Sequence, residues 1–322
     1  MALAEQIAAV GQVRSRFGPA STALDVVAGV DLSGRTAVIT GGHAGMGLEA
    51  TRAMVQAGAR VIIASRSPER AAQSLHAAGV QSGTEVLETD LADLDSIRKA
   101  VSDLRGKPVE LDYIIANAGV FDLELRRTPN GWEEQFAVNH LGHFALIAGL
   151  YPGVRPGARI VIVSSASHIA SDIHWDDIDN TDRPYDPAIA YGQSKTANAL
   201  HAVALDQLGS STGIRAFAVH PGYVPGTGLS PQLHEPGSDR AKTVPQGAAT
   251  VVWAATAPEL DQRGGIYLED CAVAAVSHST AFPRGLQDYL DAGVRPHALD
   301  SVSAQRLWSL SARRTGTDVP RG

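Results

Sequence analysis

Short apolar runs rich in β-branched residues alternate with longer helical patterns along most of this chain. The runs are apolar on both faces, which is typical of strands in a parallel sheet covered on each side. Strands are predicted at residues 36–40, 60–64, 85–88, 111–116, 159–163 and 214–219, with a seventh at 264–268. Helices are predicted at about 45–58, 67–78, 93–105, 130–150, 189–208 and 245–257. This order predicts an α/β doubly wound fold of about seven parallel strands with helices on both faces.

The alternation has no internal repeat and no low-complexity linker, so we predict a single domain at residues 35–322. Residues 1–34 form an N-terminal extension, with short helices expected at Ala4–Val10 and just before Asp31. The domain includes a loop at about 223–245 and a C-terminal helical tail at about 284–322. The loop is rich in Pro, Gly and Ser, and is either a lid over a binding site or an ordered surface connection.

A glycine-rich segment, Thr40-Gly41-Gly42-His43-Ala44-Gly45-Met46-Gly47, follows the first predicted strand and precedes a helix. Glycine suits a backbone that turns tightly or approaches a pyrophosphate, and the helix N-terminus offers free N–H groups to the anion. The placement predicts a Rossmann-type dinucleotide site, although a tight turn that binds nothing remains the alternative. The predicted contacts from this segment are Gly41, His43, Gly45, Met46 and Gly47.

The end of the second predicted strand indicates which dinucleotide binds. An acidic residue there would accept a hydrogen bond from the ribose 2′-hydroxyl and would repel a 2′-phosphate. This chain has Ser65 and Arg66 instead, so the carboxylate is missing and a guanidinium is available for a phosphate. We therefore expect NADP(H) rather than NAD(H), unless Arg66 pairs with Glu69 at the surface.

Tyr191 and Lys195 lie about one helical turn apart, so the phenol and the ammonium share one face of a predicted helix. A nearby cation favours phenolate and lowers the pKa of a tyrosine, which would make Tyr191 usable as an acid or base near neutrality. Such a pair is common on solvated helices. The glycine-rich segment upstream makes a chemical role the better interpretation.

The charge balance excludes some classes of function. Lys plus Arg is 27 and Asp plus Glu is 34 in 322 residues, which gives a net charge of −7 spread along the chain. No basic face for nucleic acid or anionic lipid is expected. The single cysteine, Cys271, cannot close an intrachain disulfide, and no apolar run approaches the roughly 20 residues of a membrane span. We expect a soluble, cytoplasmic protein.

Three motifs in order carry a family resemblance: Thr-Gly-x-x-x-Gly-x-Gly, then Asn117-Ala118-Gly119, then Tyr-x-x-x-Lys. Pro221-Gly222 after the sixth predicted strand fits the same pattern. Over about residues 30–275 the chain resembles the short-chain dehydrogenase/reductase family. Segments 135–144 and 163–168 are similar to its retinol-dehydrogenase-like branch, which includes many bacterial reductases.

The resemblance implies roles for individual residues. Tyr191 would be the general acid/base, Lys195 would lower its pKa and hold the nicotinamide ribose, and Ser165 would bind the substrate oxygen. Asn139 would hold a water in a proton relay, and Asp90 would contact adenine. The cofactor site implied outside the glycine-rich segment comprises Ser65, Arg66, Asp90, Leu91, Asn117, Ala118, Gly119, Tyr191, Lys195, Pro221, Gly222 and Val224.

The implied function is NADP(H)-dependent interconversion of a ketone or aldehyde and an alcohol. Apolar residues near the site favour a small apolar substrate, and a homo-oligomer is compatible with the resemblance. The alternatives are a noncatalytic NADP(H)-binding redox sensor and a sugar-nucleotide epimerase or dehydratase, whose loop would read Thr-Gly-x-x-Gly-x-x-Gly. Each site residue also has a structural interpretation: Ser165 could end a strand, Asn139 could bend a helix, and Asp90 could cap the helix near Asp93.

Two further groups of residues were considered for metals. His140 and His143 lie three apart on a predicted helix, but no carboxylate or cysteine completes a set, so no metal is expected. Several aspartates between 172 and 186 lack the glycine and terminal glutamate of an EF-hand loop, which favours a solvated excursion. The apolar members of the excursion either wall the substrate pocket or pack under the loop: Ile169, Ile173 and Trp175.

Overall fold

The computed structural model describes residues 13, 15–227, 229, 240–279, 288 and 293–319. Its strands form one sheet. The strand order is β3-β2-β1-β4-β5-β6-β7-β8. The first seven strands are parallel, as predicted, and the two-residue β8 runs antiparallel to β7. The strands are β1 (Thr36–Thr40), β2 (Arg60–Ser65), β3 (Thr84–Glu88), β4 (Leu111–Ala116), β5 (Val154–Val163), β6 (Arg215–His220), β7 (Ile266–Glu269) and β8 (Ala272–Val273).

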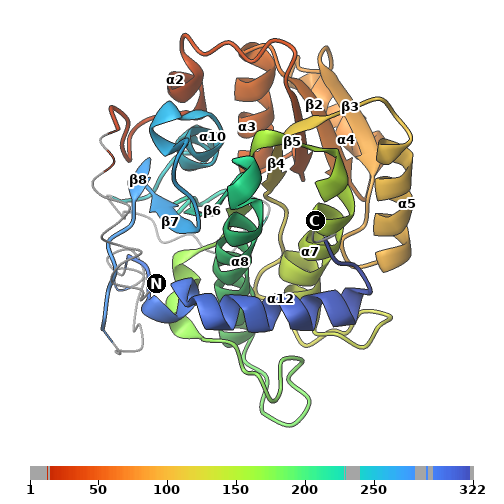
Figure 1. Cartoon of the computed structure of the whole chain (residues 1–322), viewed down its shortest axis with the longest axis vertical. Coiled ribbons are helices and arrows are strands. Elements are labelled where there is room, and N and C mark those ends of the chain that lie inside the picture. The colour runs from red at the N-terminus through yellow and green to blue at the C-terminus, as the bar shows by residue number, and fades with distance from the viewer. Residues whose placement is uncertain are drawn as a thin grey trace.

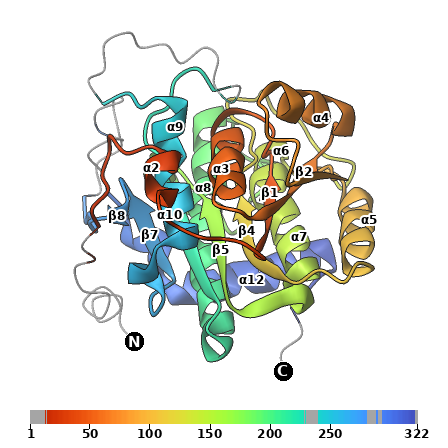
Figure 2. The same ribbon diagram turned by 90° about the horizontal axis from the view of Figure 1, so that it is seen from above.

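Helices cover both faces of this sheet, which confirms the predicted fold class (Figures 1 and 2). One layer consists of α2 (Ala23–Val27), α3 (Gly45–Gln56), α4 (Pro68–Ala77), α9 (Val244–Gly247) and α10 (Ala249–Thr256). The other consists of α5 (Leu94–Arg105), α7 (Gly142–Leu150) and α8 (Pro187–Gly209). The helix α12 (Ser301–Thr315) crosses α7 and α8 on their outer side (Figure 1).

Alternate residues of each central strand enter different cores. Val38 and Ile114 pack with the helices α5, α7 and α8, whereas Ile39 and Ile115 pack with α2, α3 and α10. All four side chains are at most 1% exposed. Burial on both faces explains why the strands read as unbroken apolar runs.

The helix predicted at about 130–150 is not continuous. The structure has a short α6 (Glu134–Phe136), a π-helical turn η1 (Ala137–Leu141) and then α7. Apolar residues continue through all three pieces, so the sequence pattern gave no sign of the change in winding. Single π-helical turns inside α-helices often lie at functional sites, and this one contains Asn139.

The aspartate-rich excursion is an ordered loop whose Asp172, Asp176, Asp182 and Asp186 are exposed, as predicted for a solvated excursion. Ile173 and Ile178 are buried beneath it, so its apolar members pack under the loop. Arg314 of α12 makes a bidentate pair with Asp179, at 3.0 and 2.7 Å. The carboxylate of Asp177 accepts three backbone N–H groups of the same loop. These bonds explain the aspartates without a metal ion.

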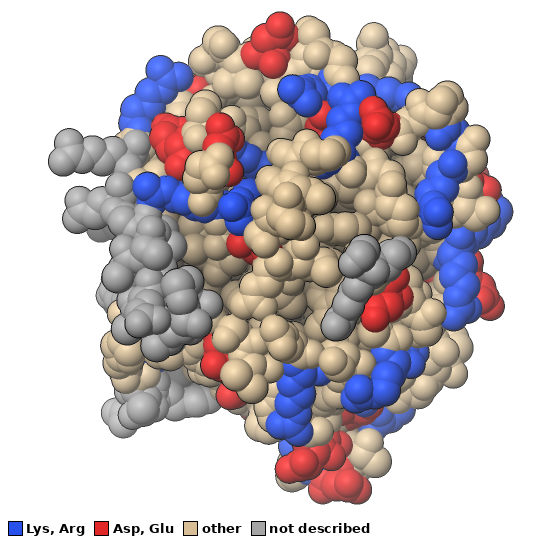
Figure 3. All heavy atoms as spheres, in the orientation of Figure 1, with Lys and Arg blue, Asp and Glu red and all other residues tan. Residues whose placement is uncertain are grey.

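The N-terminal extension contributes α2 to the core. Thr22 and Asp25 form a capping box at its start, and Val26 and Val27 are buried. The helix predicted at 4–10 lies outside the described residues, as do most of the loop at 229–244 and part of the tail. No helix among the described residues is long and apolar enough to span a membrane. On the face in Figure 3, basic and acidic side chains are interspersed.

A cluster of aromatic and histidine rings joins α12 to η1, α7 and α8. The ring of His201 lies 5.5 Å from that of His140, 5.2 Å from Phe144 and 5.8 Å from Trp308, between ring centroids. His140 Nε2 is 2.8 Å from Ser311 Oγ. Both ring nitrogens of His201 lack a hydrogen-bond partner within the described chain. His201 therefore fills this space as a neutral ring.

We expect the substitution His201→Phe to make stability less sensitive to acid. Burial lowers the pKa of His201 to about 3, whereas an unfolded histidine titrates near 6.5. The unfolded chain thus binds more protons in this window, and stability falls as the pH falls. The wild type loses free energy of unfolding between pH 7 and pH 5. In His201→Phe this loss should be smaller by on the order of 2 kcal/mol.

Chemical denaturation at the two pH values measures this difference. The control is His76→Phe at an exposed histidine, which should leave the pH dependence unchanged. An unaltered loss of stability in His201→Phe would show that this ring is already protonated, or exposed, in the folded protein.

Candidate active site

The Thr40 hydroxyl joins the glycine-rich segment to the segment after β4. Its oxygen accepts the backbone N–H groups of Asn117 and Ala118, both at 2.9 Å. His143 Nε2 lies 2.8 Å from the same oxygen, and His143 Nδ1 lies 3.0 Å from the Asn139 carbonyl. If Nδ1–H donates to that carbonyl, Thr40 donates its own proton to Nε2. Burial lowers the pKa of His143 to about 4, so the ring is neutral at pH 7.

Gly47 shows how closely the backbone is packed at the start of α3. A Cβ at this position would lie 2.4 Å from the Gly41 carbonyl oxygen and 2.6 Å from Asn117 Nδ2. Asn117 Nδ2 in turn donates to the Thr40 carbonyl at 3.0 Å. The N-terminus of α3, with its free N–H groups, therefore lies directly against the glycine turn, and this arrangement fits a dinucleotide pyrophosphate.

The end of β2 presents cations to the same region. Arg66 is exposed and makes no ion pair within the described residues, so Glu69 does not hold it. The Ser65 side chain is buried and accepts the Ser67 N–H at 3.2 Å. The pKa of His43 is lowered by burial and by the charge of Arg70. Arg70 thus adds positive potential beside the glycine-rich segment, a contribution that sequence reasoning missed.

Asp90 lies in a turn after β3. Its Oδ1 accepts the Ala92 N–H at 2.9 Å, and its backbone N–H donates to Ser96. The N-cap of α5 is Asp93, so Asp90 is not the helix cap considered as an alternative. The neighbouring residue, Leu91, packs closely against the start of α7. Gly142 has no side chain there, which leaves room for the Leu91 carbonyl oxygen.

Tyr191, Lys195 and Ser165 come together at the carboxyl end of β5. The Lys195 ammonium lies 5.3 Å from the centroid of the Tyr191 ring, and the Ser165 side chain lies close enough to the Tyr191 hydroxyl to lower its pKa. Lys195 Nζ donates to the Val163 carbonyl at 3.1 Å. The Phe121 ring packs edge-on against Tyr191, with centroids 4.6 Å apart. The spacing of Tyr191 and Lys195 predicted that these two side chains share a helix face, and they do; the place of Ser165 beside them was implied only by the resemblance.

The direction of the Tyr191 pKa differs from the sequence expectation. Burial raises the pKa of Tyr191, and the hydrogen bond from Ser165 lowers it by a smaller amount. Burial also lowers the pKa of Lys195 to about 7, so its ammonium is partly deprotonated near neutrality. The expected lowering by the lysine does not appear, because burial dominates the pKa of both groups once they are withdrawn from water.

Asn139 reaches this group from the π-helical turn. Its Oδ1 accepts the Val120 N–H at 2.8 Å, and its Nδ2 donates to the Val120 carbonyl and to Ser194 Oγ, both at 3.0 Å. A Cβ placed on Gly119 would lie 3.1 Å from Asn139 Oδ1 and 3.7 Å from Lys195 Nζ. Asn139 and Lys195 thus flank the same short segment.

The segment after β6 lies beside the glycine-rich segment. A Cβ on Gly247 would lie 2.6 Å from Val224 and 2.9 Å from Met46, so these two predicted contacts are neighbours. Pro221 is buried, and Gly222 has a φ of +90°. The predicted cofactor residues of the loops lie along the carboxyl edge of the sheet, from β3 to β6.

His140 and His143 do not share a face for metal binding. His140 contacts Ser311 in α12, whereas His143 contacts Thr40 in β1. No group of three or more His, Cys, Asp or Glu among the described residues could hold a metal ion.

A second network joins Glu133, Tyr185 and Gln135 to the loop after β4, and sequence reasoning missed it. Glu133 is fully buried, and its carboxylate caps α6. The Tyr185 hydroxyl lies 3.0 Å from Glu133 Oε1 and 3.1 Å from the Leu123 carbonyl. Gln135 Nε2 donates to the same hydroxyl at 3.0 Å. No motif marks these residues, since they lie far apart in the chain.

Comparison with known proteins agrees with this geometry. The short chain dehydrogenase family model matches residues 35–236. A probable oxidoreductase of Streptomyces antibioticus is 39% identical over 313 residues, which cover 91% of this chain and 99% of the relative. The WW domain-containing oxidoreductase of Drosophila melanogaster is 35% identical over 280 residues, which cover 81% of this chain and 68% of the relative.

A crystal structure of an uncharacterised protein from Mycobacterium paratuberculosis superposes with a TM-score of 0.74 and 31% identity. The match covers 94% of this chain and 99% of the other. The chain therefore belongs to the short-chain dehydrogenase/reductase family, whose members are oxidoreductases that use nicotinamide dinucleotides.

Proposed function

We propose that the protein interconverts a ketone or aldehyde and an alcohol with NADP(H), and that Tyr191 is the general acid/base. The observation that carries the proposal is the placement of Tyr191, whose hydroxyl lies beside the Ser165 side chain and whose ring lies 5.3 Å from the Lys195 ammonium. Asn139 and Lys195 flank Gly119 on the inner side of this group. The three hydrogen-bonding groups support proton transfer at a substrate oxygen.

A nicotinamide held by the residues along this edge would supply a hydride to the carbonyl carbon or accept one from the alcohol carbon. Ser165 polarises the carbonyl oxygen, and Tyr191 delivers the proton in the reductive direction. Lys195, with a pKa of about 7, is suited to return a proton toward Tyr191, and Asn139 positions the relay beside it. Holding these groups together supplies orientation, which is a large part of such catalysis.

Preference for NADP(H) is supported by the unpaired Arg66 and by the positive potential of Arg70 near His43. We expect Arg66→Ala to raise the KM for NADPH by about tenfold or more, because it removes a charge-assisted contact to the 2′-phosphate. The KM for NADH should change little. Steady-state kinetics with each cofactor measure the shift.

Arg313→Ala provides a matched control, because Arg313 is also exposed but lies on α12. Its cofactor preference should equal that of the wild type. If Arg66→Ala also keeps the wild-type ratio of NADPH to NADH efficiency, Arg66 does not clamp the phosphate.

The placement in the retinol-dehydrogenase-like branch is supported by segments 135–144 and 163–168 and by the likeness to the WW domain-containing oxidoreductase. An apolar substrate has less support than the sequence suggested, since Ile169 and Ile173 are buried under the loop. Whether copies of the chain associate is a separate proposal, which light scattering would test.

NADPH oxidation across a panel of ketones and aldehydes of graded size tests the activity. Turnover of at least one carbonyl is expected. NADPH binding with no turnover across the whole panel would contradict the proposal and favour a noncatalytic sensor.

A further inference from the structure

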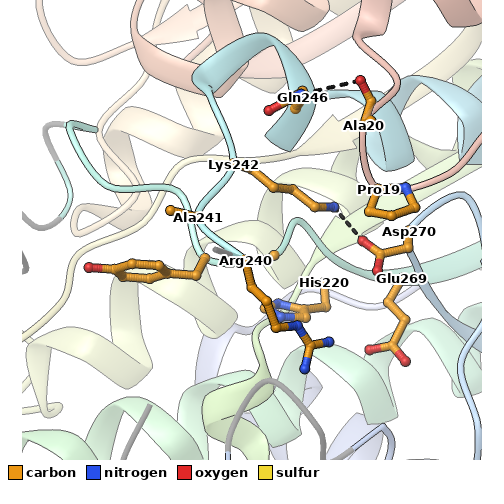
Figure 4. A pocket seen from close by; sticks show the side chains of 11 residues that line it. Pro19, Ala20, His220, Arg240, Ala241, Lys242, Gln246, Glu269 and Asp270 are labelled. Atoms are coloured by element: carbon orange, nitrogen blue, oxygen red, sulfur yellow. Dashed lines mark hydrogen bonds and ion pairs between the residues drawn. The ribbon is translucent and has the colours of Figure 1, made fainter. Parts of the chain in front are cut away.

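A cavity of about 370 Å³ lies at the carboxyl ends of β6 and β7 (Figure 4). Its other walls come from residues 240–242 and from Pro19 and Ala20 of the N-terminal extension. In open α/β sheets, ligands bind outside the carboxyl ends of the strands. The volume lies at the lower end of the range for small-molecule sites.

The cavity borders the catalytic side of the sheet. Val219 and Leu268 pack in the core with α10, so the next residues, His220 and Glu269, point to the face that carries α8 and Tyr191. His220 Nδ1 accepts the backbone N–H of Ala166 at 3.2 Å. Ala166 follows Ser165, the residue proposed to bind the carbonyl oxygen.

His220 presents a hydrogen-bond donor. Because Nδ1 accepts the Ala166 N–H, the neutral ring carries its proton on Nε2. Burial lowers the pKa of His220 to about 4, so this neutral form holds at pH 7. Figure 4 places the ring beside Arg240 in the wall of the cavity.

Lys242 and Asp270 form an ion pair on the opposite wall. The Lys242 side chain is 8% exposed, and its stem packs against Gly222, where an added Cβ would lie 2.8 Å from Cδ. Asp270 and Cys271 both have positive φ, at 50° and 55°, because they form the two-residue turn of the β7–β8 hairpin. The turn places the Asp270 carboxylate beside Lys242.

The charges in this cavity nearly balance. Two cations, Lys242 and Arg240, face two carboxylates, Glu269 and Asp270. Burial first, and then the Asp270 charge, raise the pKa of Glu269 to about 7, while Lys242 and Arg240 act in the opposite direction. An anion entering here would meet carboxylates, and a cation would meet the lysine and the arginine. A hydroxyl group avoids both conflicts because it both donates and accepts.

We propose that this cavity binds a neutral, polyhydroxylated part of the substrate, held by His220, Glu269 and the Lys242–Asp270 pair. The inference rests on the proposed function, because it places the hydroxylated arm next to a carbonyl at Ser165. The substrate class is then a polyhydroxy ketone or aldehyde.

Four ketones of equal chain length test the class: xylulose, methyl propyl ketone, levulinate and aminopentanone. Xylulose is neutral and hydroxylated, and methyl propyl ketone is neutral without hydroxyl groups. Levulinate carries a negative charge and aminopentanone a positive charge. With NADPH, the wild type should reduce xylulose with a kcat/KM about tenfold above that of methyl propyl ketone, the effect of one or two added hydrogen bonds. Levulinate and aminopentanone should show no such gain.

Glu269→Leu should remove the preference for xylulose while leaving methyl propyl ketone within about twofold, and Glu269→Gln should keep most of it, since an amide donates and accepts. Glu259→Leu, at an exposed position after α10, is the matched control and should behave as the wild type. Equal efficiencies for xylulose and methyl propyl ketone in the wild type would overturn the proposal. So would a preference for either charged ketone, or an equal loss on both substrates in Glu269→Leu.

Direct binding separates this proposal from the proposed function. Calorimetry with xylitol and pentanol, in the presence of NADP⁺, measures the cavity without turnover. Tighter binding of xylitol that is lost in Glu269→Leu supports the cavity even if no ketone is reduced, in which case only the proposed activity fails. Equal or absent binding of the two alcohols, together with equal reduction of the two ketones, refutes the cavity alone.

Discussion

Tyr191→Phe is expected to lower kcat by about 10²–10⁴ while NADPH still binds. The substitution removes the hydroxyl that lies beside Ser165 and keeps the ring that packs against Phe121. The loss should therefore fall on proton transfer rather than on the fold. Stopped-flow or steady-state NADPH oxidation gives kcat, and quenching of protein fluorescence gives the NADPH affinity.

Tyr151→Phe is the control for loss of a phenolic hydroxyl, because Tyr151 lies at the far end of α7. Its kinetics should match the wild type. If Tyr191→Phe reduces an accepted ketone at the wild-type rate, Tyr191 is not the general acid/base.

Gly47→Ala is expected to weaken NADPH binding by about a hundredfold. The new Cβ would stand 2.4 Å from the Gly41 carbonyl oxygen and 2.6 Å from Asn117 Nδ2, so the glycine turn and the Asn117 side chain must both move. A displacement of this size in a binding segment has effects of that order. Fluorescence titration with NADPH measures the affinity, and thermal unfolding without cofactor shows how much stability is lost.

Gly18→Ala provides the comparison, because nothing lies within 4 Å of a Cβ at that position. It should leave both NADPH affinity and thermal stability unchanged. An NADPH affinity in Gly47→Ala equal to that of Gly18→Ala would mean that the glycine turn does not cradle the cofactor.

The sheet could be predicted because its strands are buried on both faces. Runs such as 36–40 and 111–116 then read as continuous apolar segments, and the structure places β1 and β4 there. The two-residue β8 could not be found this way, since so short a strand has no periodicity. The break at Ala137–Leu141 was also hidden, because the side chains around it are buried whichever way the helix winds and no local residue marks the change.

The candidate site was predictable where a motif lies in one segment. Tyr191 and Lys195 share a helical face because of their spacing, and the structure bears out their proximity. The direction of the Tyr191 pKa was not predictable, since burial depends on chains that pack over the site. The Thr40–His143 contact joins residues 103 positions apart, which no local pattern can reveal.

The π-helical turn at Ala137–Leu141 holds one residue more than an ordinary helical turn. Deleting one residue there would return the turn to α-helical winding, and α7 would keep its orientation, so His143 would still face Thr40. The change would be confined to the turn that presents Asn139 to Val120 and Ser194. A shortened chain would therefore keep its core and lose the placement of one side chain.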